Sequence, residues 1–134
     1  MPPPAHILLV EDSTLVAAAL RILLEDAGHR VTAVGTVNEA MACLGADPPD
    51  VMLLDLSLPD GDGLSVLARA AGSPAPPRVT VAITGHDDPA IRDRCLRAGC
   101  RDVLVKPIAA AQLPGQIRSW LEGGESRSMA KHEV

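Results

Sequence analysis

The chain has 134 residues, of which 47% are hydrophobic and 22% are charged, and Trp120 is its one aromatic side chain. A chain of this length typically folds as one domain around one core. Its formal net charge of -5 repels phosphate backbones and anionic lipids, and it offers no Phe or Tyr on which single-stranded bases could stack, so we expect no direct nucleic-acid partner.

The sequence carries no pattern typical of a membrane span or a secretion signal. The longest uninterrupted apolar run, Leu15–Leu20, is far shorter than the ~18 residues that a membrane span needs. Residues 1–4 carry no basic side chain, and the apolar run Ile7–Val10 is followed at once by Glu11 and Asp12. We therefore expect a cytoplasmic protein with no membrane partner.

Five short runs rich in Val, Ile and Leu alternate with stretches of helical character, a pattern typical of βαβ units and a parallel sheet. The first and third runs are apolar throughout, which favours the centre of the sheet, whereas Thr32 in the second run and the shortness of the fifth favour its edges. We predict an α/β, flavodoxin-like, doubly wound five-stranded parallel sheet in the order 2-1-3-4-5, with helices on both faces. The predicted strands are Ile7–Val10, Val31–Val34, Val51–Leu54, Val79–Ile83 and Val103–Val105.

The first helix is predicted to begin at Asp12, Ser13 or Thr14 and to end at Gly28. Its apolar stripe is predicted from residues at helical spacing: Val16, Leu20, Leu23 and Ala27.

Capping patterns predict the start of two later helices. Thr36 and Glu39 form a capping-box pattern, and Asp88-Pro89 places a capping carboxylate before a proline in a helix that Gly99 can close.

The last helical stretch places Leu113, Ile117, Trp120 and Leu121 on one face. It also contains Pro114, so the helix either begins near Pro114 or is kinked there. Beyond it, residues 123–134 are polar and predict a flexible tail after a domain of residues 1–122.

The three cysteines, Cys43, Cys95 and Cys100, are an odd number without Cys-x-x-Cys spacing. Disulfide frameworks and zinc sites use other patterns, so we interpret these side chains as reduced thiols that contribute to packing.

Polar residues follow four of the predicted strands. Glu11 and Asp12 follow the first, Asp55 the third, Thr84 ends the fourth, and Lys106 follows the fifth. The carboxyl ends of parallel strands meet at one edge of the sheet, where ligands bind. Each residue alone has an ordinary explanation as a helix cap, a turn, a strand end or a solvated charge, but their coincidence at one edge predicts a site.

Three carboxylates at this edge need a counter-ion. At about 4 Å and an effective dielectric constant of about 20, each pair repels by on the order of 4 kcal/mol. Mg²⁺ prefers oxygen ligands and typically works beside a phosphate, and together with the charge of Lys106 it balances three negative charges. The sequence therefore predicts a magnesium site that is suited to a phosphoryl group.

Taken together, the motifs resemble a response-regulator receiver domain of two-component signalling over about residues 5–122. The order and spacing of the motifs, more than any one of them, carry the resemblance. They are Ile7-Leu8-Leu9-Val10-Glu11-Asp12, Val51-Met52-Leu53-Leu54-Asp55 with Leu58-Pro59 and Asp62-Gly63, Ile83-Thr84-Gly85, and Val103-Leu104-Val105-Lys106-Pro107.

The resemblance implies a phospho-accepting switch rather than an enzyme, with Asp55 as the phosphoryl acceptor. Glu11, Asp12 and Asp55 would hold Mg²⁺ directly or through water, and the backbone carbonyl of Ser57 would be a further ligand. Thr84 would donate a hydrogen bond to a phosphoryl oxygen. Carboxylate nucleophiles and cation-stabilised phosphoryl oxygens are general chemistry that agrees with these roles.

Lys106 would pair with the acceptor carboxylate or with the phosphoryl group.

The implied donor is a phosphohistidine on a sensor histidine kinase or phosphotransfer protein, docked on the first helix and the Pro107-Ile108 loop. Residues 91–101 and the last helix, together with the fifth strand between them, would form a self-association face of the fourth helix, fifth strand and fifth helix. The sequence departs from the family at Val103, where many receivers carry an aromatic residue that rotates; we therefore expect Thr84 and the backbone to carry the signal.

Two alternatives remain from the residues alone. A haloacid-dehalogenase-like phosphatase also uses a strand-end Asp and Mg²⁺, but it places a second Asp where this chain has Ser57. A flavodoxin-like binding domain would make the acidic edge incidental, yet the chain has no Gly-rich first loop and no flanking Phe or Tyr for a flavin. Within the receiver resemblance, a further alternative is a receiver-like binding module that is not phosphorylated, although all the expected acceptor-site residues are present.

Overall fold

A computed structural model describes residues 4–123; the predicted flexible tail lies outside this range from residue 124 onward. The elements, in chain order, are β1 (His6–Val10), α1 (Thr14–Asp26), β2 (Arg30–Val34), α2 (Val37–Ala46), β3 (Val51–Asp55), β4 (Ser57–Leu58), β5 (Gly61–Asp62), α3 (Gly63–Ala71), β6 (Val79–Thr84), α4 (Pro89–Arg97), β7 (Asp102–Val105), the 3-10 turn η1 (Ala110–Gln112) and α5 (Leu113–Leu121). None of the helices within residues 4–123 is long and apolar enough to cross a membrane.

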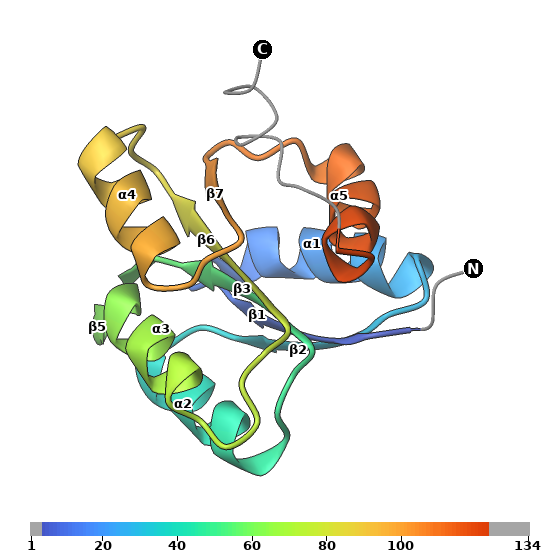
Figure 1. Cartoon of the computed structure of the whole chain (residues 1–134). Coiled ribbons are helices and arrows are strands. Elements are labelled where there is room, and N and C mark those ends of the chain that lie inside the picture. The colour runs from blue at the N-terminus through green and yellow to red at the C-terminus, as the bar shows by residue number, and fades with distance from the viewer. Residues whose placement is uncertain (1–3, 124–134) are drawn as a thin grey trace.

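The five long strands form one parallel sheet in the order β2-β1-β3-β6-β7, which confirms the predicted topology (Figure 1). β1 lies between β2 and β3, so that Ile7 is in register with Val31 on one side and Val51 on the other. Every residue of β1 and β3 is buried, as expected of central strands. Each strand matches its predicted run to within one residue at either end.

Alternate side chains of the strands enter two separate cores. Ile7, Leu9 and Leu53 point to the face covered by α1 and α5, where Ile117 and Trp120 pack against them. The opposite side chains pack against α2, α3 and α4 in the second core. Both faces of the sheet are therefore covered, and only its ends are open to ligands.

The apolar stripe of α1 differs from the prediction. Ala17, Leu20 and Leu24 are buried, whereas Val16 is 40% exposed and the predicted Ala27 is exposed. The predicted stripe was thus right at Leu20 and wrong at Val16 and Ala27. Because α1 has apolar residues on most of its sides, periodicity alone does not determine which side faces the sheet.

The predicted caps are confirmed. Thr36 accepts a hydrogen bond from the Glu39 amide, while the Glu39 carboxylate accepts from the Gly35 amide, one residue before the usual capping-box donor. Asp88 caps α4 by accepting from the Ala90 amide.

The last helix, α5, begins at Leu113 with Pro114 in its first turn, which selects the first of the two alternatives for this proline. Cys43, Cys95 and Cys100 are free thiols, as predicted.

Candidate functional site

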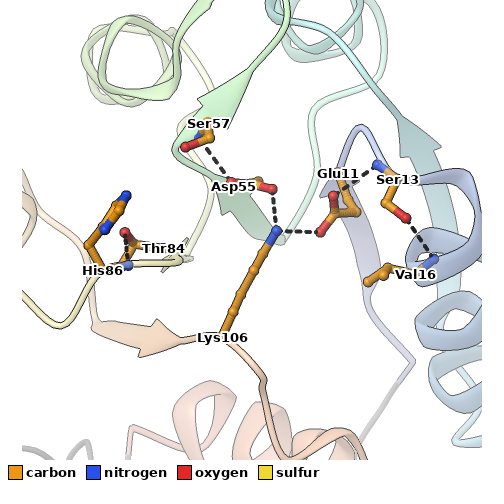
Figure 2. A network of polar contacts seen from close by, with 8 residues as sticks. All are labelled: Glu11, Ser13, Val16, Asp55, Ser57, Thr84, His86 and Lys106. Carbon is orange, nitrogen blue, oxygen red and sulfur yellow. Dashed lines mark hydrogen bonds and ion pairs between the residues drawn. The ribbon is translucent and has the colours of Figure 1, made fainter.

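The carboxyl ends of β1, β3 and β7 bring Glu11, Asp55 and Lys106 into direct contact (Figure 2). The ammonium Nζ of Lys106 lies 2.7 Å from Oδ2 of Asp55 and 3.1 Å from Oε1 of Glu11. Asp55 is only 1% exposed and Glu11 only 4%, whereas the lysine side chain is about one-third exposed. A cation thus bridges two buried carboxylates at the edge where the sequence predicted a site.

Burial and pairing act on the protonation of these groups in opposite directions. Burial alone lowers the pKa of Lys106, but its hydrogen bonds to Asp55 and Glu11 outweigh that effect and the pKa is raised. Burial raises the pKa of Glu11 above its ordinary value, against the hydrogen bonds from the Ser13 amide and Lys106. At neutral pH Lys106 is therefore charged and supplies one positive charge to the site.

Asp12 completes a cluster of three carboxylates. Ligand oxygens of Glu11, Asp12 and Asp55 all lie within 4.8 Å of one another, and Asp12 is exposed to solvent. Around an octahedral Mg²⁺ with bonds of about 2.1 Å, neighbouring ligand oxygens lie about 3 Å apart and opposite ones about 4 Å apart. Small movements or bridging waters would therefore bring the three carboxylates into ligand distance. Three carboxylates against one ammonium leave two negative charges, which a divalent cation balances. The donor set thus fits Mg²⁺.

Ser57 lies at the start of a short hairpin that follows Asp55. Its backbone amide donates to Oδ1 of Asp55 at 2.9 Å, so both carboxylate oxygens of Asp55 have a partner, the second being Lys106 (Figure 2). The Ser57 side chain is exposed. The sequence did not predict the β4–β5 hairpin, because its strands have two residues each and show no period.

Thr84 ends β6 beside the acidic cluster. β6 pairs with β3 so that Asp55 is in register with Ile83, which puts Thr84 one residue beyond. The buried Thr84 hydroxyl accepts a hydrogen bond from the His86 amide at 3.1 Å, so its own hydrogen remains able to donate (Figure 2). The sequence analysis did not predict His86 at this edge. Its position two residues after the strand-end hydroxyl of Thr84 is the pattern from which this contact could have been predicted.

Comparisons with known proteins agree with this arrangement. The response regulator receiver domain family model matches residues 7–118. The transcriptional regulatory protein PmrA of Pectobacterium parmentieri is 32% identical over 128 residues, 96% of this chain and 57% of PmrA. The virulence transcriptional regulatory protein PhoP of Salmonella typhimurium is 33% identical over 116 residues, 85% of this chain and 50% of PhoP.

A solved structure is similar as well. The receiver domain of the sensor histidine kinase PA1611 from Pseudomonas aeruginosa PAO1, which has a magnesium ion coordinated in its active-site cleft, aligns with a TM-score of 0.78 and 30% identity. The alignment covers 90% of this chain and 99% of that domain.

A doubly wound sheet with an acidic cluster and a lysine at its carboxyl edge agrees with a phospho-accepting signalling domain, and the family match selects this class. The chain belongs to the response regulator receiver domain family of two-component systems, whose members are phospho-accepting switches and generally not enzymes. The phosphatase and flavodoxin-like alternatives are not favoured. The chain spans about half the length of the curated relatives named above. Because those relatives are transcriptional regulators, the comparisons give no support to the expectation that nucleic acid is not a partner.

Proposed function

We propose that Asp55 is the phosphoryl acceptor of this switch. The supporting observation is a buried carboxylate held between the Lys106 ammonium at 2.7 Å and the Ser57 amide at 2.9 Å. An Asp55 oxygen attacks the phosphorus of a phosphohistidine, the P–N bond breaks, and the imidazole leaves with the bonding electron pair. Later attack of water on phosphorus releases inorganic phosphate and restores the carboxylate, which resets the switch.

Glu11, Asp12, Asp55 and the Ser57 carbonyl are the proposed Mg²⁺ ligands, some of them through water. When bound, the ion neutralises charge on the acceptor and on the phosphoryl oxygens. Lys106 holds Asp55 before transfer and pairs with a phosphoryl oxygen afterwards. Thr84 donates its hydroxyl hydrogen to another phosphoryl oxygen, which draws the loop after β6 towards the site.

The proposed donor is a histidine kinase or histidine phosphotransfer protein that docks on α1 and the loop after Lys106. Leu15 is 80% exposed and Ile22 62%, which are unusual values for large apolar side chains on one helix. An apolar cavity of about 470 Å³ lies between α1 and this loop, with Val16, Pro107 and Ile108 among its lining residues. An apolar helix of the donor protein would cover these side chains while its phosphohistidine reaches Asp55.

Two finer proposals concern assembly and location. Self-association through α4, β7 and α5 would cover Leu96, which is 37% exposed on α4. Light scattering before and after phosphorylation measures the mass of the assembly. An unchanged monomer mass would contradict self-association. The free thiols agree with a cytoplasmic location.

Intact-mass measurement after incubation with acetyl phosphate and Mg²⁺ tests the acceptor. We expect one phosphoryl adduct that hydroxylamine removes, as it removes acyl phosphates. Asp55→Asn abolishes the adduct, because the amide is not a nucleophile towards phosphorus. Asp26→Asn, which removes an exposed carboxylate at the end of α1, retains it. An adduct that persists in Asp55→Asn would contradict the proposal.

A further inference from the structure

Asp60, in the turn between β4 and β5, is bonded to the start of a distant helix. Its Oδ1 accepts from the Val37 amide at 2.7 Å, and its Oδ2 accepts from the Asn38 amide at 3.1 Å. These amides belong to the first two residues of α2, which already has its own N-cap, Thr36. The Asp60 bonds are therefore additional to the local cap, and they join segments 22 and 23 residues apart.

The hairpin that carries Asp60 is tied to the acceptor at its other end. The Ser57 amide bonds Asp55, the Gly63 amide bonds the Leu56 carbonyl at 3.1 Å, and the Leu56 amide bonds the Ile83 carbonyl at 2.9 Å. The hairpin itself is held by two residue pairs only, and an isolated hairpin of this kind is marginally stable in water. Its tip therefore depends on an anchor outside the hairpin.

The contact with α2 is suited to be that anchor. A carboxylate that accepts two backbone amides makes charge-assisted hydrogen bonds, and the positive end of the helix dipole adds to them. The hydrogen bond from the Val37 amide lowers the pKa of Asp60, so the group is anionic at neutral pH. The turn lies against α2, because a Cβ added at Gly61 would be 3.4 Å from a methyl carbon of Val37.

We propose that Asp60 is a positioning residue for the Mg²⁺ site: by joining the hairpin tip to α2, it holds the Ser57 carbonyl and the Ser57 amide where the metal and Asp55 need them. This inference rests on the proposed function, since Ser57 and Asp55 are taken as ligands. Asp60 itself is not one of the proposed ligands. Its effect is on metal affinity, through a loop that would otherwise move.

The test compares Mg²⁺ dissociation constants, measured by calorimetry on the full chain, for the wild type, Asp60→Ala and Thr36→Ala. Thr36→Ala is the matched control, because it removes a capping oxygen from the same helix but leaves the hairpin contact. Both variants lower the Tm by a similar few degrees. We expect Asp60→Ala to weaken Mg²⁺ binding by about tenfold, as is typical when an outer-shell partner of a ligand is lost. Thr36→Ala keeps the wild-type constant.

Two further readouts separate positioning from general destabilisation. Amide exchange over residues 57–62 becomes faster in Asp60→Ala and not in Thr36→Ala. Saturating Mg²⁺ restores the rate of phosphorylation by acetyl phosphate in Asp60→Ala. Asp60→Asn, which keeps one acceptor oxygen, falls between the wild type and Asp60→Ala and serves if the alanine variant does not fold.

The outcomes distinguish the inference from the function on which it rests. A wild-type chain that binds no Mg²⁺ and accepts no phosphoryl group would overturn both. The positioning role alone would be overturned by a different result. In that case the wild type binds Mg²⁺ and accepts the phosphoryl group, but Asp60→Ala and Thr36→Ala have the same Mg²⁺ affinity and the same amide exchange over residues 57–62.

Discussion

Lys106 and Asp55 are 51 residues apart in the chain, yet Nζ of the lysine lies 2.7 Å from Oδ2 of the aspartate. The same ammonium lies 3.1 Å from Glu11, so one cation is shared by two carboxylates that are almost fully buried. In the metal-free site this lysine is the counter-ion that makes the acidic cluster tolerable. Mg²⁺ held by the proposed ligands Glu11 and Asp55 would lie near the same ammonium, and the two cations would repel each other.

Replacing the lysine tests this balance. We expect Lys106→Met to lower the metal-free unfolding free energy by about 1–2 kcal/mol; this is less than the ~3–5 kcal/mol for a fully buried pair, because the lysine is partly solvated. Mg²⁺ binds the variant more tightly than the wild type, since the competing charge is gone, and it raises the Tm of the variant more. Calorimetry with and without Mg²⁺ measures both effects.

A surface cation provides the control for Lys106→Met. Arg21 pairs with Glu25 on the exposed side of α1, at 3.1 Å. Arg21→Met therefore changes the unfolding free energy by no more than about 0.5 kcal/mol and leaves the Mg²⁺ constant unchanged. Weaker Mg²⁺ binding in Lys106→Met would show that the lysine assists the metal instead of competing with it.

Gly63 allows the chain to pass directly against Asp55, the proposed acceptor. A Cβ at this position would lie 2.7 Å from the Asp55 carbonyl oxygen and 2.8 Å from the Leu56 Cα, both backbone atoms. Gly63→Ala therefore shifts the backbone at Asp55, lowers the unfolding free energy by about 1–3 kcal/mol and slows phosphorylation by acetyl phosphate.

Gly45 is the matched control for Gly63→Ala, because it lies within α2 and a Cβ there meets nothing within 4 Å. Gly45→Ala should raise the unfolding free energy by about 0.5–1 kcal/mol and leave phosphorylation unchanged. Denaturant unfolding and the phosphorylation rate measure the pair. A Gly63→Ala chain as stable and as reactive as the wild type would mean that the loop has room to move.

His29 makes stability depend on pH. Its Nδ1 accepts from the Ala5 amide at 3.1 Å, and burial lowers its pKa from 6.5. The unfolded chain therefore binds the proton more readily than the folded chain. The histidine's contribution to stability is complete above pH 6.5 and is lost as the pH falls towards the lower folded pKa. Thermal unfolding across this range measures the decline.

Two substitutions isolate the histidine. His29→Asn keeps an acceptor for the Ala5 amide and removes the titration, so the Tm of this variant changes less with pH below 6.5 than that of the wild type. His29→Ala leaves the amide without its partner and is less stable at every pH. Equal pH dependence in the wild type and His29→Asn would assign the effect to other groups.

The signal is expected to travel without an aromatic rotation. Val103 is buried in the second core, and its carbonyl accepts from the Arg92 guanidinium at 3.0 Å, which links β7 to α4. We predict that phosphorylation slows amide exchange over residues 85–89, because Thr84 draws this loop inward. Thr84→Val accepts the phosphoryl group but shows no such slowing. Exchange that is the same in the free and phosphorylated wild type would refute this route.

The sheet and most of the site could be predicted because their signals are local. Runs such as Ile7–Val10 and Val51–Leu54 are apolar at every position, and only a strand covered on both faces needs that. Since the carboxyl ends of parallel strands share one edge, the polar residues after those runs had to meet. The tertiary structure shows Glu11, Asp12, Asp55 and Lys106 together, as predicted.

The topology and the identity of the groups at the carboxyl edge could thus be predicted, because periodicity and strand ends follow from neighbouring residues. The buried side of α1 could not be predicted, since Val16 and Ala17 are both apolar and packing against the sheet buries Ala17 rather than Val16. The contact of Asp60 with α2 could not be predicted either, because no local pattern specifies a hydrogen bond between residues that come together when two loops fold side by side.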